Sequence, residues 1–89
     1  MLEKEFAIVN KLGLHARASA LLVKNATRFH SEIRIEREGV EVNGKSIMGI
    51  MMLAAAKGST IMVHVHGDDE DEALKGLEKI FKDKFGEKE

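Results

Sequence analysis

The sequence predicts an α+β fold in which a four-stranded antiparallel sheet carries helices on one face. Three observations lead to this prediction. Apolar residues recur with the periods of strands and helices in the order β-α-β-β-α-β-α. Two β-α-β units are joined by a hairpin, which favours an antiparallel sheet. The strands alternate apolar and polar residues, so we expect the other face of the sheet to contact water.

The first strand and the first helix flank a short turn. The apolar run at residues 6–9 predicts the strand, and the segment from Asn10 to Gly13 predicts the turn that closes it. From Ala16 to Phe29, small and apolar residues recur at steps of three and four, which predicts an amphipathic helix with one buried stripe. The residues of this stripe are Ser19, Ala20, Leu22, Val23, Ala26 and Phe29.

A hairpin follows the first helix. Ile33 and Ile35 alternate with charged residues, which is the pattern of a half-buried strand. The pair at residues 38–39 (Glu-Gly) is a turn signal, and Val40 and Val42 then alternate with charge in a second strand. These two strands are therefore predicted to pair with each other.

The second half of the chain predicts a short helix, a strand and a long helix. The segment from Ser46 to Leu53 predicts the short helix, with Ser46 as its N-cap. The alternation from Thr60 to Val65 predicts the fourth strand. The last helix is expected to begin at Asp68 or Asp69, because acidic residues fill its first turn. Its apolar stripe consists of Ala73, Leu74, Leu77, Ile80, Phe81 and Phe85.

The length and composition of the chain limit the classes of protein to which it can belong. A chain of 89 residues predicts one domain, residues 1–89. It contains no cysteine, and its charged N-terminus lacks the apolar run of a signal peptide, so we expect a cytoplasmic protein. No window is long and apolar enough for insertion into a membrane. The formal net charge of −1 and the absence of Tyr and Trp argue against a nucleic-acid-binding protein.

His15 is the first candidate functional residue, because it stands at the expected start of a helix just after Gly13. The first N–H groups of a helix lack intrahelical partners and, with the helix dipole, they form an anion site. Arg17 offers a planar fork of donors for phosphate oxygens. A neutral imidazole in this setting predicts a phosphoryl acceptor. A surface histidine that only begins the helix is the structural alternative, although Ser or Asp would cap it better.

Ser46 and the apolar residues after it form the second candidate site. A capping role alone accounts for Ser46, and core packing accounts for part of the apolar set. A phosphoserine here would add about −1.5 to −2 charges to a surface that docks partners. Methionine is common on surfaces that bind several partners, so the short helix also predicts an exposed docking patch. The apolar residues are Ile47, Met48, Met51 and Met52.

The remaining titratable groups predict neither a metal site nor a cofactor. His64 and His66 share one face of a strand, but no third ligand has suitable spacing, so we expect a solvent-facing pair. His30 is expected at the end of the first helix, where a charged imidazole favours the dipole. The acidic run at residues 68–72 lacks the spacing and the glycine of a calcium loop, and we interpret it as the first turn of the last helix.

Three segments together resemble the HPr family, the histidine-containing phosphocarriers of the bacterial phosphoenolpyruvate-dependent phosphotransferase system. They are residues 13–17 (Gly-Leu-His-Ala-Arg), 45–49 (Lys-Ser-Ile-Met-Gly) and 56–58 (Ala-Lys-Gly). The resemblance covers nearly the whole chain and implies an open-faced β-sandwich, with three helices on one side of four antiparallel strands. It also implies a carrier that becomes phosphorylated itself, and not an enzyme with turnover on a small molecule.

The resemblance implies a role for particular residues. His15 would accept a phosphoryl group at Nδ1 from phosphorylated enzyme I and pass it to a histidine of an enzyme IIA-type partner. Arg17 would stabilise that group, and Ser46 matches the serine that HPr kinase/phosphorylase modifies in many members. The residues implied to dock partners are Ala16, Ala20, Lys24, Ile47, Met48 and Met51.

One residue departs from the family pattern, and several alternatives stay open. Many members carry proline where this chain has Ala18, but alanine is an excellent helix former, so we expect the chemistry of His15 to be retained. A regulatory family member, serving a kinase or nitrogen or carbon control instead of sugar uptake, is the first alternative. A small-molecule or metal-binding module is the second, and ligand-dependent stabilisation would reveal it. We expect a monomer.

Overall fold

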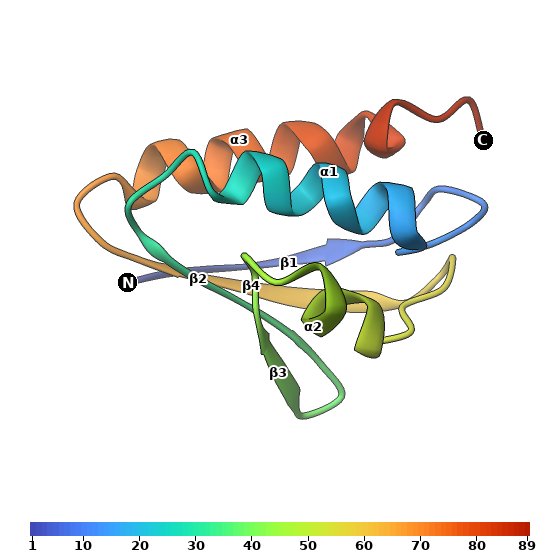
Figure 1. Ribbon diagram of the computed structural model, residues 1–89, viewed down its shortest axis with the longest axis horizontal. Coiled ribbons are helices and arrows are strands. Elements are labelled where there is room, and N and C mark those ends of the chain that lie inside the picture. The colour runs from blue at the N-terminus through green and yellow to red at the C-terminus, as the bar shows by residue number, and fades with distance from the viewer.

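The computed structural model describes all of residues 1–89. Its elements are β1 (Leu2–Ala7), α1 (Ala16–Ala26), β2 (Glu32–Arg37), β3 (Val40–Asn43), α2 (Ile47–Met52), β4 (Thr60–His66), α3 (Glu70–Lys82) and a short 3₁₀ helix, η1 (Lys84–Gly86). The strands form one sheet in the order β1-β4-β2-β3, and every pair is antiparallel. α1 and α3 lie side by side over one face of the sheet (Figure 1), and α2 packs against α1 and β3. The predicted α+β fold and its element order are confirmed.

The core lies between the sheet and the helices. β2 and β4 turn alternate residues inward, and these side chains are fully buried: Ile33, Ile35, Ile61, Val63 and Val65. The helices contribute Ala18, Leu22 and Ala26 from α1 and Ala73, Leu77 and Phe81 from α3. Burying each large aliphatic side chain contributes about 1.5–3 kcal/mol, so this layer is the main source of stability. None of the helices combines the length and the hydrophobicity that a membrane span requires.

The first strand differs from the predicted run at residues 6–9. Its pairing with β4 begins at Leu2, opposite Val65, and ends at Ala7, opposite Thr60. The charged residues 3–5 hide this strand from a search for apolar alternation, because β1 lies at the sheet edge and exposes them. Backbone hydrogen bonding to β4 therefore defines the element, and its apolar content does not.

Helix α1 ends at Ala26, three residues before the predicted end at Phe29. The carboxylate of Asp69 accepts the N–H groups of His30 (2.8 Å) and Ser31 (2.9 Å), and these bonds direct the chain into β2. Phe29 lies beyond the helix but still packs against the core. His30 is thus outside the last helical turn, and its expected role as a partner of the helix dipole is wrong.

Candidate functional site

The loop before α1 is anchored to the segment that follows α2. Gly13 has a φ of +66°, and a Cβ on this residue would lie 2.5 Å from the carbonyl oxygen of Ala55 and 2.9 Å from Cα of Ala56. Glycine suits this position because it tolerates the positive φ and lets the two backbones approach. The N–H of Leu14 donates to the carbonyl oxygen of Ala55 at 2.9 Å, and the Leu14 side chain is buried. These contacts fix the residues directly before His15.

His15 is the N-cap residue of α1, with extended backbone angles. Its carbonyl oxygen accepts the first helical hydrogen bond, from the N–H of Ser19 at 2.9 Å. Its side chain does not cap the helix, and the N–H groups of residues 16–18 have no acceptor in the structure. The hydroxyl of Ser19 donates to the carbonyl oxygen of Leu14 at 3.1 Å. The first turn of α1 therefore offers free N–H donors beside the imidazole.

The C-terminal tail contacts the imidazole of His15. Nε2 of His15 lies 2.5 Å from Oε2 of Glu87, and the His15 side chain is 28% exposed. Oε1 of the same carboxylate accepts from Nδ2 of Asn10 at 2.9 Å, and that amide also donates to the carbonyl oxygen of Gly13. The bond from Asn10 is the main cause that lowers the pKa of Glu87, and the bond from His15 and the charges of His15 and Arg17 add to it.

An open hollow of about 750 Å³ lies beside the imidazole at the start of α1. Arg17 is exposed on its rim, so its guanidinium is available to an anion that enters the hollow. Leu12 is also exposed there, and it is the most apolar part of the wall. The lining residues are Lys11, Leu12, His15, Ala16, Arg17, Glu87, Lys88 and Glu89.

Helix α2 carries Ser46 at its start and apolar side chains on its surface. Oγ of Ser46 accepts the N–H of Gly49 at 3.0 Å, so this serine is the predicted N-cap. The exposed apolar side chains are Ile47, Met48, Met51 and Met52, between 41% and 76% exposed. α2 packs against α1, on which Ala16, Ala20 and Lys24 follow at four-residue steps. The residues expected to dock partners therefore lie on neighbouring helices.

Comparison with known proteins decides the family. A family model described as "PTS HPr component phosphorylation site" matches residues 2–83. The chain belongs to the HPr family. Phosphocarrier protein HPr of Cupriavidus necator is 49% identical over 89 residues, which are the whole of both chains. HPr-like protein Crh of Halalkalibacterium halodurans is 52% identical over 77 residues, 86% of this chain and 92% of that protein.

Solved structures of the HPr family share the fold. A crystal structure of HPr-C-His from Thermoanaerobacter tengcongensis is 46% identical, covers 100% of both chains and superposes with a TM-score of 0.96. This likeness confirms the open-faced sheet with three helices that the sequence resemblance implied. Because the chain belongs to the HPr family, proteins of the phosphotransferase system are its expected partners.

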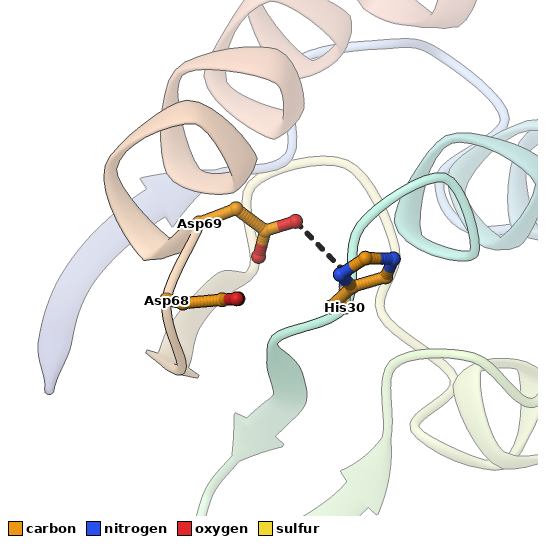
Figure 2. A group of neighbouring side chains, drawn as sticks. All are labelled: His30, Asp68 and Asp69. Carbon is orange, nitrogen blue, oxygen red and sulfur yellow. Dashed lines mark hydrogen bonds between the residues drawn. The ribbon is translucent and has the colours of Figure 1, made fainter.

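A first group of metal-ligating side chains lies far from His15 along the chain. His30, Asp68 and Asp69 converge where α3 begins, and Figure 2 shows the Asp69 carboxylate directed at His30. Asp69 accepts bonds from the backbone N–H groups of His30 and Ser31 and from the Ser31 hydroxyl. These bonds, the hydroxyl bond first, lower the pKa of Asp69 to about 2. Both carboxylate oxygens are thus occupied in joining the α1–β2 connection to α3.

A second group, Glu36, Glu41 and His64, lies on the open face of the sheet. Nε2 of His64 is 3.1 Å from Oε1 of Glu36, and Nδ1 is 3.5 Å from Oε1 of Glu3. His64 and His66 share the face away from the helices, as predicted, but only His66 is exposed, because His64 lies between two carboxylates. Arg34 is opposite His64 in the strand register and adds a positive charge, which disfavours a cation there.

Sequence reasoning missed two residues of the site, Asn10 and Glu87. The sequence pattern places Asn10 only in a turn and Glu87 after the last predicted helix, so neither belongs to a periodic pattern. The two residues are 77 positions apart, and their contact exists only because α3 lies beside α1. The only local signal is that Asn10 is a short polar residue before the turn at Gly13, and this signal does not indicate which residue Asn10 contacts.

Proposed function

We propose that this chain carries a phosphoryl group on Nδ1 of His15, accepting it from phosphorylated enzyme I and passing it to a histidine of an enzyme IIA-type partner. The bond between Glu87 and Nε2 is the observation that carries this proposal, because it leaves Nδ1 as the ring nitrogen without a hydrogen bond. In each transfer the lone pair of the accepting nitrogen forms the new N–P bond. The donor N–P bond breaks, and its electron pair returns to the donor ring.

The first turn of α1 supports the phosphoryl group electrostatically. Its free N–H groups and the positive end of the helix dipole lie at the helix end from which His15 extends. Arg17 adds a full positive charge and a donor fork that suits phosphoryl oxygens. Donors that are already in place stabilise the charge that develops during transfer without reorganisation.

The exposed apolar side chains of α2 form the docking surface for both partners. Ile47, Met48 and Met51 leave apolar area in water that a partner would cover. Methionine adapts its shape to different surfaces, which suits a carrier that meets two unlike proteins in turn. Ala16, Ala20 and Lys24 on α1 extend this docking surface toward His15.

Ser46 is the proposed site of regulatory phosphorylation by HPr kinase/phosphorylase. The serine is half-buried at the start of α2 and directly precedes Ile47 and Met48. A phosphate on Oγ adds about −1.5 to −2 charges to the docking surface. The added charge has to be desolvated when a partner docks on apolar side chains, so the modification weakens the encounter with enzyme I.

The proposed carrier works in the cytoplasm as a monomer, without a cofactor, and does not turn over a small molecule. A regulatory role is the second candidate, because this chain is also similar to HPr-like protein Crh, and a solved structure of Crh from Bacillus subtilis is described as a catabolite repression HPr. A regulatory protein would report phosphorylation to a kinase or regulator and would not pass the group to an enzyme IIA-type histidine.

Intact-mass measurement tests the proposal. The chain is incubated with phosphoenolpyruvate, magnesium and enzyme I from the same source. We expect the wild-type mass to increase by one acid-labile phosphoryl group and the mass of His15→Ala to stay unchanged. Arg17→Ala should gain the phosphoryl group more slowly than the wild type, at unchanged thermal stability. No gain while enzyme I itself becomes phosphorylated would refute the carrier. A gain in His15→Ala would place the phosphoryl group on another residue.

A further inference from the structure

We infer that Glu87 is a positioning residue, which holds His15 in the tautomer that has its proton on Nε2 and its lone pair on Nδ1. The inference rests on the proposed function only for its consequence in phosphoryl transfer. The tautomer itself is a property of the unphosphorylated chain. Glu87 would thereby select the ring nitrogen that accepts the phosphoryl group.

For a neutral imidazole, the hydrogen-bond chemistry of the contact allows only one tautomer. An ionised carboxylate is only an acceptor, so the nitrogen that faces it has to donate. Glu87 is ionised near neutral pH, because its pKa lies below the ordinary value for a glutamate. Oε2 of Glu87 lies 2.5 Å from Nε2 of His15, so Nε2 carries the proton. In the neutral ring, the other nitrogen is then the nucleophile.

Asn10 fixes the carboxylate in this position. The side chain is fully buried, and its Nδ2 donates both to the carbonyl oxygen of Gly13 and to Oε1 of Glu87, each at 2.9 Å. Both partners are acceptors, so the orientation of the amide is determined by them. The amide thus connects the His15 loop to the tail. It also leaves Oε2 as the oxygen of Glu87 that faces the imidazole.

The backbone of the C-terminal tail turns after α3 and brings Glu87 into contact with His15. After α3, Lys84, Phe85 and Gly86 have φ values of +52°, +57° and +77°. Left-handed backbone is unfavourable at the first two residues, so other contacts have to hold it. Phe85 is buried, with its ring 5.5 Å from that of Phe81 in an edge-to-face contact. The tail is therefore packed against the domain directly before Glu87.

A second contact holds the tail beyond Glu87. The N–H of Lys11 donates to the main-chain oxygen of Glu89 at 2.5 Å, and Nζ of Lys11 lies 3.3 Å from the side-chain carboxylate of Glu89. Glu87 is thus held from both sides. During transfer the new bond forms at Nδ1 and the proton stays on Nε2, so the ring gains a positive charge that the facing Glu87 carboxylate offsets. The ring needs no tautomer change before it attacks phosphorus.

The variant Glu87→Gln tests this role. We expect Oε1 of the glutamine to accept from Asn10, as the carboxylate does, because the Asn10 amide cannot turn without facing the Gly13 carbonyl. The glutamine N–H then points at Nε2 of His15 and favours the tautomer with its proton on Nδ1. Glu89→Gln is the matched control, because it removes the same charge two positions away, while the main-chain bond from Lys11 to Glu89 that holds the tail remains.

Long-range ¹H–¹⁵N correlation spectra of ¹⁵N-histidine-labelled protein, at a pH where the ring is neutral, measure the tautomers. We expect the wild type and Glu89→Gln to show the proton of His15 on Nε2. In Glu87→Gln the ratio of the two tautomers should change by about tenfold or more toward Nδ1–H. The same tautomer ratio in Glu87→Gln and wild type would overturn the inference, as would a wild-type proton on Nδ1.

Phosphorylation by enzyme I separates this inference from the proposed function. The initial rate for Glu87→Gln should fall in proportion to the fraction of rings with a free Nδ1. A changed tautomer with an unchanged rate would overturn the role of Glu87 in transfer. If even the wild type is not phosphorylated, the carrier function fails, whereas an unaltered tautomer in a phosphorylated Glu87→Gln protein removes only the role of Glu87.

Discussion

Replacing Gly13 with alanine tests how the His15 loop is held. The new Cβ would lie 2.5 Å from the carbonyl oxygen of Ala55 and 2.9 Å from Cα of Ala56, and both are backbone atoms that cannot rotate away. The same oxygen accepts the N–H of Leu14 at 2.9 Å. We therefore expect the loop to move away from residues 55–56, and the Leu14 bond to be weakened first.

Two costs add at Gly13. A left-handed φ costs an L-residue about 1–2 kcal/mol. Forcing an extra carbon into a packed contact costs about 1–3 kcal/mol. The sum of about 2–5 kcal/mol is a large part of the roughly 4–13 kcal/mol expected for a chain of this length. Gly39→Ala is the matched control, because Gly39 has a φ of +84° and no atom within 4 Å of its Cβ position.

Urea unfolding followed by far-ultraviolet circular dichroism measures the difference, since the chain has no Trp or Tyr for fluorescence. The free energy of unfolding should fall by about 1–3 kcal/mol more in Gly13→Ala than in Gly39→Ala, because only the first variant places its Cβ against another backbone segment. Hydrogen exchange at the Leu14 amide should be faster in Gly13→Ala alone. Equal losses in both variants, with Leu14 protected as in the wild type, would refute the close contact as the anchor of the loop.

Two further predictions concern hydrogen bonds that side chains make to the backbone. The pKa of Asp69 is lowered from 3.8 to about 2, so its ionised form stabilises the fold above about pH 4 and this contribution disappears as pH falls through 2. Thermal melts from pH 5 to pH 2 should therefore fall more steeply for the wild type than for Asp69→Asn, and parallel curves would contradict this. Ser46→Ala should cost about 1 kcal/mol through loss of the bond to Gly49, whereas Ser46→Asp keeps a capping oxygen and should not. Ser46→Asp should nevertheless slow phosphorylation by enzyme I, and equal unfolding energies for the two variants, or an unchanged rate in Ser46→Asp, would count against these assignments.

Local periodicity predicts much of this fold, because the buried stripes obey it. The apolar stripe of the last helix anticipates the burial of Ala73, Leu77 and Phe81, and the capping role of Ser46 follows from its place before an apolar run. The end of α1 could not be predicted in the same way. It is decided by Asp69, which lies 39 residues from His30 along the chain. The sequence pattern indicates only a helix start at Asp69.

The candidate site likewise has a part that follows from local sequence and a part that depends on the folded chain. His15, its helix start and Arg17 are neighbours in sequence, so their association follows from local structure. Glu87 reaches His15 through a tail with left-handed backbone at Lys84 and Phe85, residues whose side chains carry no preference for that conformation. Neither composition nor spacing encodes such a turn. The burial of Phe85 against Phe81 determines it, and that contact exists only in the folded chain.

The contacts around His15 hold the ring in place and leave Nδ1, the proposed reactive nitrogen, without a hydrogen bond. Gly13 and Leu14 fix the backbone, Asn10 and Glu87 fix Nε2, and no hydrogen bond of the structure involves Nδ1. The proposed carrier has to release a phosphoryl group as readily as it accepts one. Donors that stabilise the transition state speed transfer in both directions, whereas donors that stabilised the loaded form more would slow release. The free N–H groups of the first turn of α1 and the exposed Arg17 lie beside the imidazole, where they serve the charge that develops in both loading and release.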